Sequence, residues 1–271
     1  MKKFFYILMT VLAVGMISCN KEKKNGEGED DGPLYRIKSL SYTDNWYEEG
    51  LPNHEDPDEI GWYDTWTYTY DAQGRVIKVF REEGKPEKNW TLSYEGNKVT
   101  ITREDGKEIL TLELNAKGVC TSIKDDVKES EWGPYDETAV FEYDATNRPT
   151  KITKEGELRS VITLRDNCLV SWTKEKESRT RTFTYSNTKN LGDLHEIYSE
   201  AIDPPARWLY ETGLFGHGPA YLVATSVWED DPENGSTITH KLDENGYVLW
   251  EKKVFPGGGT EFFKIEWEEI K

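Results

Sequence analysis

The chain has 271 residues and carries 34 lysines and arginines against 51 aspartates and glutamates, which gives a formal charge of −17. Binding to nucleic acid or to an anionic lipid surface depends on clustered basic residues, so this charge argues against both partners. With 36% hydrophobic residues, the chain is long enough and apolar enough to bury a core.

The N-terminus has the pattern of a lipoprotein signal. Lys2 and Lys3 precede an apolar run over residues 4–17, and a serine then precedes Cys19. A charged start, a short apolar stretch and a small residue before the cut are typical of a secretory leader rather than of a membrane span. The cysteine resembles the lipobox of bacterial lipoproteins. That resemblance implies lipidation of Cys19 and, because Asn20 follows it, sorting to the outer membrane.

The leader, residues 1–18, holds two lysines and no acidic residue, so its removal takes the formal charge from −17 to −19. Residues 19–33 offer no apolar side chain beyond the cysteine, and they predict a disordered tether between the lipid and a folded domain. We expect residues 34–271 to form a single domain, since the 253 residues that remain without the leader lie within the range of one all-β domain.

From Leu34 onward, apolar residues recur at every second position between Gly, Asn and Asp residues, which is the signature of strands and turns. The pattern repeats about every 21 residues, a length that fits one β-hairpin with its turns. Each repeat ends a strand with Tyr or Leu just before a turn: Tyr70, Tyr94, Leu114, Tyr143, Leu164, Tyr185 and Leu242. The sequence therefore predicts an all-β, antiparallel, up-and-down meander of a dozen or more strands that forms a barrel or half-barrel.

The alternation also assigns the two faces of the sheet. Positions two and four residues before each closing residue share its face and are mostly apolar, so this face is predicted to be buried. The opposite face is rich in threonine and is predicted to contact water; it carries Thr67, Thr69, Thr91, Ser93, Thr111, Glu113, Thr163, Thr182, Thr184 and Thr239.

One interval, between Tyr185 and Leu242, is too long for a single repeat. Asp193 can cap a helix, and an apolar stripe follows it until Pro204-Pro205, so we expect one short covering helix over residues 193–202. The segment GLFGHGPAYL, residues 213–222, follows before the strands resume.

The repeated Y-D-x-x-G/N-R units, the GLFGHGP segment and the closing hairpin LDENGYV resemble a Bacteroides-type lipoprotein domain of unknown function that has a porin-like β fold. The resemblance covers roughly residues 60–250. The YD units also resemble the YD repeats of large Rhs-type toxins. The resemblance implies a fold and no activity. It does not imply a membrane-spanning porin, because a lipid-facing wall needs an apolar band where this chain places threonine and charge.

Cys120 and Cys168 could form a disulfide in an oxidising envelope. The repeat alignment places Cys168 at the turn position that Gly74 and Gly118 hold, and it places Cys120 on the buried face. Two unreactive thiols are therefore favoured over a disulfide, which requires close Cα atoms.

Cofactor and metal chemistry find no support in the motifs. The histidines His54, His195, His217 and His240 show no ligand-pair spacing, and the acidic stretches do not match the calcium-binding loop. There is no nucleophile elbow and no phosphate-binding loop. We therefore expect no cofactor, no metal and no enzymatic activity.

Two features are candidates for ligand binding. Trp66 and Tyr68 alternate on one predicted strand and Trp90 lies on a neighbouring one, which favours either core packing or an aromatic platform for a sugar. His240 occupies an inward position where the other repeats have apolar or aromatic residues, so it needs a hydrogen-bond partner in the core or contacts a ligand.

These features predict an outer-membrane lipoprotein whose domain is a non-catalytic binding module for a glycan, a peptide or an envelope protein. A structural or assembly component of the envelope is the alternative. A hydrolase that uses paired carboxylates is the weakest of the three hypotheses.

Overall fold

The structure is a computed structural model that describes residues 35–44, 64–81, 89–128, 135–195, 207–256 and 258–270. The predicted leader, the tether and Cys19 lie outside the described residues, as do His54 and the acidic stretch over residues 55–59.

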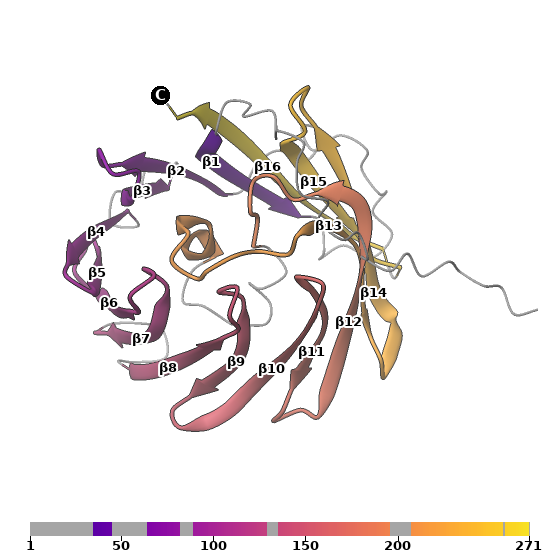
Figure 1. The fold of residues 1–271 in the computed structure, drawn as a ribbon, viewed down its shortest axis with the longest axis horizontal. Coiled ribbons are helices and arrows are strands. Elements are labelled where there is room, and N and C mark those ends of the chain that lie inside the picture. Colours follow the sequence, from indigo (N-terminus) through magenta and orange to yellow (C-terminus); the bar gives the residue numbers. More distant parts are fainter. Residues whose placement is uncertain are drawn as a thin grey trace, which may run out of the picture. The chain divides into compact units, whose positions relative to one another are not determined.

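The described chain folds into strands that form one closed antiparallel barrel (Figure 1). The first eight strands are β1 (Tyr35–Asp44), β2 (Asp64–Tyr70), β3 (Val76–Arg81), β4 (Trp90–Glu95), β5 (Lys98–Arg103), β6 (Glu108–Leu114), β7 (Cys120–Val127) and β8 (Tyr135–Tyr143). The second eight are β9 (Pro149–Lys154), β10 (Glu157–Arg165), β11 (Cys168–Lys174), β12 (Arg179–Lys189), β13 (Tyr221–Trp228), β14 (Asp231–Leu242), β15 (Val248–Val254) and β16 (Thr260–Glu269). Each strand pairs with the next one, and β16 pairs with β1. The predicted all-β meander is confirmed, and its closed form is now defined.

The repeated Y-D-x-x-G units are turns capped by the aspartate. The carboxylate of Asp71 accepts the backbone N–H groups of Gln73 and Arg75, each at 2.9 Å. Gly74 has a φ of +77°, a conformation that a residue without Cβ adopts at little cost. Asn115, Asp144 and Asp243 accept backbone N–H groups in the same pattern.

The tyrosine of the unit ties the hairpin to its neighbouring strand. The hydroxyl of Tyr94 donates to the carbonyl of Val76 at 2.9 Å, and that of Tyr143 donates to the carbonyl of Cys120 at 2.7 Å. Tyr185 donates to Leu169 in the same way. Burial raises the pKa of Tyr94 to about 12, so this hydroxyl remains a donor at any physiological pH.

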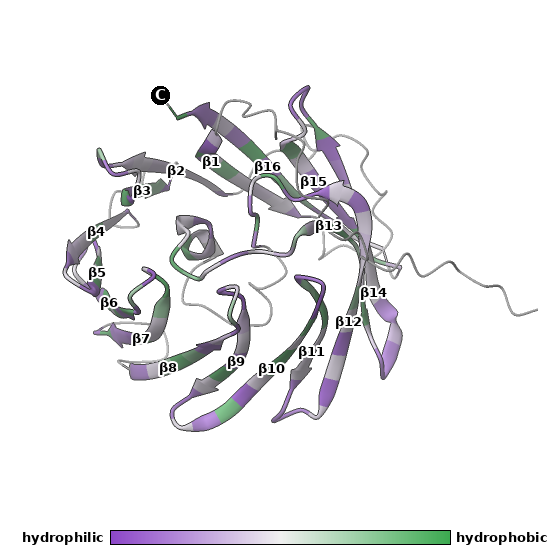
Figure 2. Ribbon diagram, in the orientation of Figure 1, coloured by the Kyte–Doolittle hydropathy of each residue, from purple (hydrophilic) through white to green (hydrophobic). Residues whose placement is uncertain are grey.

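The predicted faces are confirmed. The inward positions form the core, which includes Leu92, Leu110, Leu112, Phe141, Ile162 and Phe183, all buried. The threonines and other polar residues predicted to contact water are exposed or half-buried. The resulting alternation of hydropathy along the strands is visible in Figure 2.

The predicted position of Cys168 is wrong. The turn between β10 and β11 is formed by Asp166 and Asn167, which both have positive φ, as two-residue hairpin turns require. This turn is one residue shorter than the glycine turns, so Cys168 is the first residue of β11. Cys120 and Cys168 are both buried thiols.

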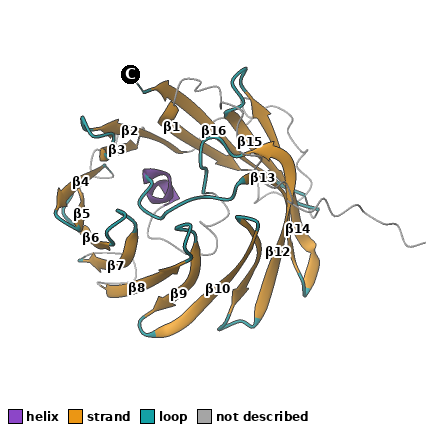
Figure 3. Ribbon diagram, viewed as in Figure 1, coloured by secondary structure: helices purple, strands orange, loops and turns teal. Residues whose placement is uncertain are grey.

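The predicted helix is also misplaced where it can be assessed. Asp193 has a φ of +51°, and residues 193–195 are not helical; residues 196–202 lie outside the described residues. The helix that the structure describes is a 3-10 helix, η3 (Arg207–Thr212), which follows the two prolines. Figure 3 shows it encircled by the strands.

Candidate functional site

One end of the barrel interior, where the Y-D-x-x-G turns lie, is filled by the chain itself. We call residues 207–220 the plug. Trp208, Leu209, Tyr210 and Phe215 of the plug are each no more than 2% exposed. The phenyl ring of Phe215 packs edge-on against that of Phe141, with ring centroids 5.4 Å apart.

Backbone hydrogen bonds fasten the plug to turns from different parts of the barrel. The amide of Cys120 donates to the carbonyl of Leu214 at 2.7 Å, and the amide of His217 donates to the carbonyl of Asn147 at 3.0 Å. The amide of Ala220 donates to the carbonyl of Asn167, also at 3.0 Å. The GLFGHGP segment is therefore a structural element that closes this end.

Asp193 forms hydrogen bonds with the part of the plug that follows Phe215. The carboxylate of Asp193 accepts the amide of Gly218 and hydrogen-bonds Nδ1 of His217, both at 2.8 Å. His195 is buried beside this carboxylate, and burial lowers its pKa to about 4, so the imidazole is neutral at physiological pH.

Two of the three aromatic residues singled out in the sequence, Tyr68 and Trp90, contact the plug. The hydroxyl of Tyr68 donates to the carbonyl of Trp208 at 3.2 Å, and the rings of Trp90 and Trp208 lie 5.6 Å apart. Trp66, on the same strand as Tyr68, is 9% exposed. These contacts favour core packing, the first of the two roles that the sequence left open for these aromatic residues.

Away from the turns, the inward face becomes charged. Residues directly opposite each other on neighbouring strands share a face. By this criterion several charged residues point inward, because they stand opposite core residues: Arg81 opposite Trp66, Arg103 opposite Trp90, and Asp125 opposite Leu110. We call this part of the interior the charged end.

Ion pairs connect neighbouring strands at the charged end. Lys154 contacts Glu137 at 2.6 Å, and Lys253 contacts Glu261 at 3.4 Å. Arg81 pairs with Asp64. Lys253 and Glu261 are buried, whereas the side chains of the other two pairs are partly exposed. Ion pairs of both kinds add little net stability.

Glu108 is a carboxyl group of this wall with a raised pKa. Burial raises its pKa to about 7, and the charge of Asp125 raises it further than Arg103 can lower it. The Arg103 guanidinium contacts the Glu108 carboxylate at 2.9 Å. Glu108 therefore titrates near neutral pH.

His240 lies on β14 with its side chain almost fully buried, and its Nε2 hydrogen-bonds the Glu251 carboxylate at 2.9 Å. This carboxylate supplies the partner that an inward histidine needs. In the wall, β1, β16 and β15 separate β14 from β2, so His240 is not a neighbour of Trp66 and Tyr68 along the sheet.

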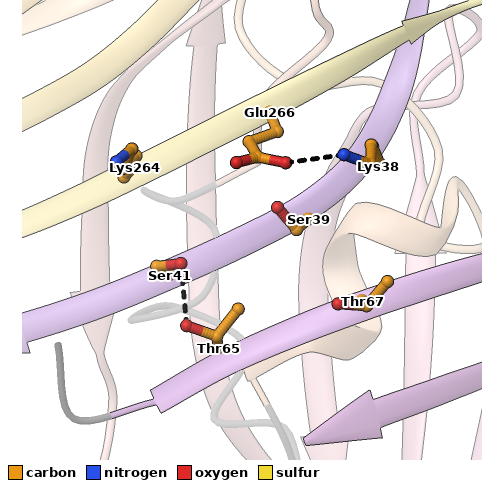
Figure 4. Close-up of a pocket in the computed structure, with 7 residues that line it drawn as sticks. All are labelled: Lys38, Ser39, Ser41, Thr65, Thr67, Lys264 and Glu266. Atoms are coloured by element: carbon orange, nitrogen blue, oxygen red, sulfur yellow. Dashed lines mark hydrogen bonds and ion pairs between the residues drawn. The ribbon is translucent and has the colours of Figure 1, made fainter. Parts of the chain in front are cut away.

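A shallow polar groove of about 240 Å³ lies on the outer wall where the barrel closes (Figure 4). Its lining consists of hydroxyl groups from β1 and β2 and charged groups from β1 and β16: Ser39, Ser41, Thr65, Thr67, Lys38, Lys264 and Glu266. Ser41 and Thr65 hydrogen-bond each other at 2.9 Å, and Lys38 pairs with Glu266 at 3.0 Å. Four of the seven lining side chains are therefore paired with one another.

Among the described residues, no group of three or more His, Cys, Asp and Glu side chains is arranged to hold a metal ion. Within the same residues, no helix is both long enough and apolar enough to cross a membrane.

The fold is shared with two solved structures. A porin-like protein from Bacteroides uniformis matches 86% of this chain and 98% of its own length, with a TM-score of 0.64 and 19% identity. A porin-like protein from Bacteroides vulgatus matches 87% of this chain and 99% of its own, with a TM-score of 0.50 and 13% identity. No protein-family model and no curated protein matches the sequence. At these identities the similarity defines a porin-like barrel fold.

The sequence analysis did not predict the charged end, although the alternation of residues along the strands contains a signal for it. Extending the alternation to six residues before each closing residue reaches Asp64, Glu108, Glu137, Arg179 and Ser236 in five of the repeats. The inward face thus changes from apolar to polar one step beyond the positions that define the core.

Proposed function

We propose that the chain is an outer-membrane lipoprotein, anchored through Cys19, whose barrel is a non-catalytic binding module for a glycan, a peptide or an envelope protein. The observation that supports the proposal best is the contrast inside the barrel. One end is filled by the plug, whereas the other presents inward charged groups on a rigid wall. Such a wall offers the convergent polar groups that binding sites require.

The composition of the outer wall favours a barrel that is surrounded by water. Its outward positions carry threonine and charge, as at Thr91, Ser93, Glu113 and Thr239, which are all exposed. A barrel within lipid would need an outward apolar band. In the proposal the lipid on Cys19, and not the barrel wall, holds the protein at the membrane.

Trp66, Tyr68 and Trp90 have a supporting role in this proposal, because all three are buried and Tyr68 and Trp90 contact Trp208 of the plug. His240 lies on β14 two residues before the closing residue Leu242, and it pairs with Glu251. Replacing it with leucine removes the bond to Glu251 and tests whether this pair contributes to binding.

Anchoring is tested by fractionating cells that produce the Cys19→Ser variant. We expect the variant to leave the membrane fraction and to lack the mass of the lipid. Cys168→Ser is the matched control, since Cys168 is a buried thiol of the barrel, and it should remain in the membrane fraction. A Cys19→Ser variant that fractionates with membranes at unchanged mass would contradict the proposal.

Binding is tested by applying the purified full-length protein to arrays of glycans and peptides. The proposal expects saturable binding to at least one class. Failure to bind any member favours the alternative, a structural or assembly component of the envelope.

A further inference from the structure

The groove on the outer wall is built from two rows of side chains that cross the closure of the barrel. Residues directly opposite each other on neighbouring strands share a face, and both rows run from β16 through β1 to β2. The rows are Lys264, Ser41 and Thr65, and Glu266, Ser39 and Thr67. Figure 4 shows both rows. The groove therefore carries short hydroxyl side chains on β1 and β2 and long charged side chains on β16.

A β-bulge in β1 adds Lys38 to the same face. The pairing of β1 with β16 shifts between Ile37 and Ser39, so Lys38 is the extra residue. A bulge redirects side chains locally, and Lys38 lines the groove beside Ser39. Its ammonium group bonds the Glu266 carboxylate at 3.0 Å, and the two side chains are 55% and 51% exposed. An ion pair this exposed contributes little stability, so it can share its hydrogen bonds with a ligand.

The groove is accessible from solvent. It has a volume of about 240 Å³, with Ser39 and Ser41 at its floor and the half-buried Thr65 and Thr67 on its β2 side. Pockets that enclose a whole drug-sized ligand have volumes of about 300–1,000 Å³. The groove is smaller than these, and it therefore fits one segment of a longer ligand that lies across the wall.

The hydroxyl groups keep hydrogen-bonding capacity that the fold does not use. A hydroxyl group has one donor and two acceptor sites. The bond between Ser41 and Thr65, 2.9 Å long, uses one donor and one acceptor of this pair, so a second donor and further acceptor sites remain. The hydroxyl of Thr67 forms no hydrogen bond within the described part of the chain. The groove thus offers both donors and acceptors to a ligand.

Aromatic side chains lie on the same face at both sides of the groove. Phe80 of β3 stands directly opposite Thr67, and Trp250 of β15 stands directly opposite Lys264. Both aromatic residues are half-buried. The indole of Trp250 packs edge-on against Phe262, with ring centroids 6.0 Å apart. A ligand that crosses the strands from β15 to β3 would meet an aromatic ring at each side of the hydroxyl groups.

We propose that this groove binds a neutral oligosaccharide that lies across the strands between Trp250 and Phe80. The inference goes beyond the proposed function, because it adds a site on the outer wall, apart from the charged end. The sugar hydroxyls exchange hydrogen bonds with the four serine and threonine hydroxyls and with the Lys38–Glu266 pair. The C–H faces of the sugar rings pack on the aromatic side chains.

The chemistry of the groove favours a neutral sugar over other ligands. A peptide that adds as a strand needs an unpaired sheet edge, whereas β1 and β2 are each paired on both sides. An anion would meet a lysine that Glu266 already compensates, on a chain with a formal charge of −17. An acyl chain would take the hydroxyl groups out of water without replacing their hydrogen bonds.

The test is calorimetric titration of the full-length protein in a detergent without a sugar head group, because a sugar head group would compete for the groove. The neutral probes are cellotetraose and maltotetraose. The competing probes are tetragalacturonate, which adds carboxylates, and tetraserine, which carries hydroxyl groups on a peptide backbone. We expect at least one neutral probe to bind about tenfold or more tightly than either competing probe.

Variants that lack hydroxyl groups separate binding from folding. Thr67→Val should leave the melting temperature unchanged and weaken binding of the neutral probe by about three- to tenfold. Ser41→Ala with Thr65→Val removes both partners of one bond, so neither is left unsatisfied, and it should weaken binding by about ten- to a hundredfold. Thr163→Val is the matched control, because Thr163 is an exposed threonine of β10, and it should change affinity by less than about twofold.

The outcomes distinguish this inference from the proposed function. Binding of a neutral probe that the groove variants weaken and Thr163→Val does not would support the site. If a neutral probe binds and no groove variant weakens it, the groove is the wrong site and the proposed binding function stands. If tetragalacturonate or tetraserine binds most tightly, the ligand class is wrong and the function again stands. If neither neutral probe binds, the inference fails, and the arrays of glycans and peptides decide the proposed function separately.

Discussion

The two ends of the barrel interior differ in the polar groups that face inward and in how those groups are paired. At the turn end, polar groups are mostly neutral and are satisfied within the chain, as where Tyr143 donates to Cys120 and Cys120 donates to Leu214. At the charged end, carboxylates, guanidinium groups and ammonium groups face inward in pairs. The same hairpin repeat therefore builds a packed core and a polar wall within one strand length.

The difference teaches where stability and function are expected to lie. Apolar burial stabilises the fold by about 25 cal/mol per Å². The buried apolar cluster joins the plug to the inward positions of the strands. The ion pairs of the charged end add little net stability, because most are partly exposed and a buried pair must offset its desolvation. Substitutions at the turn end should cost stability, whereas substitutions at the charged end should change mainly pH dependence and binding.

The largest effect is expected for Phe215→Ala in the plug. Phe215 is 1% exposed and contacts the rings of Phe141 and Tyr210, so its truncation should lower the free energy of unfolding by about 3–5 kcal/mol. Urea unfolding measures this loss. Val140→Ala, at an exposed position of β8, is the control and should stay within about 0.5 kcal/mol. A loss below about 1 kcal/mol for Phe215→Ala would show that the plug does not support the barrel.

Gly216→Ala should have the next largest effect. Gly216 has a φ of +83°, and an added Cβ would lie 1.9 Å from the carbonyl oxygen of Asn147. Gly74→Ala is the matched control, since Gly74 has a φ of +77° and open space around its Cβ position. Thermal or urea unfolding should give about 1 kcal/mol of destabilisation for Gly74→Ala and roughly 2 kcal/mol or more for Gly216→Ala. Equal losses would mean that the plug does not approach the turn closely.

Glu108→Gln should change the pH dependence of stability by about 1–2 kcal/mol. The pKa of Glu108 is about 7 in the folded chain, above the usual value near 4.5, so folding takes up a proton in this window. Its contribution is complete below pH 4.5 and is lost as the pH rises through 7. Unfolding measured between pH 5 and 8 should therefore show a smaller decline for Glu108→Gln than for the wild type. Parallel profiles would place Glu108 in a more solvated environment.

The smallest effect is expected for Tyr94→Phe, which removes one hydrogen bond and keeps the packing of the ring. The bond from the Tyr94 hydroxyl to the Val76 carbonyl is 2.9 Å long, and its loss should cost about 0.5–1.5 kcal/mol. Tyr143→Phe should cost a similar amount, because Tyr143 makes the equivalent bond to Cys120. If either variant is as stable as the wild type, the tyrosine hydroxyl does not contribute to the stability of the repeat.

The meander and its faces could be predicted because both depend on local pattern. Alternation places Tyr68, Leu92 and Phe141 inward whatever the rest of the chain does, and Asp71 with Gly74 specifies a turn from four neighbouring residues. The one-residue error at Cys168 has the same local origin, since Asp166-Asn167 forms a shorter turn than the glycine units do.

The plug and the charged end could not be predicted because they depend on residues far apart in the sequence. Nothing near Phe215 indicates that it will meet Phe141, and nothing near Arg181 indicates that Trp228 will lie beside it. The 3-10 helix lies beyond Pro204-Pro205, where local rules predict a helix end, because its bulky residues gain their burial from the barrel and not from helical periodicity.

Closure by the first and last strands sets the order of events when the protein folds. Arg36 of β1 contacts Glu268 of β16 across 232 positions of sequence, whereas most of the other strand pairs are hairpins with short turns. Hairpins can form as the chain emerges, but β1 keeps an unpaired edge until the final strand has been delivered. The slow step is then the joining of the two ends, which loop entropy disfavours and which leaves partly assembled sheets able to pair with one another. A chain cut before β16 would expose two such edges at once, so loss of residues 260–271 should turn a self-contained barrel into an aggregating sheet.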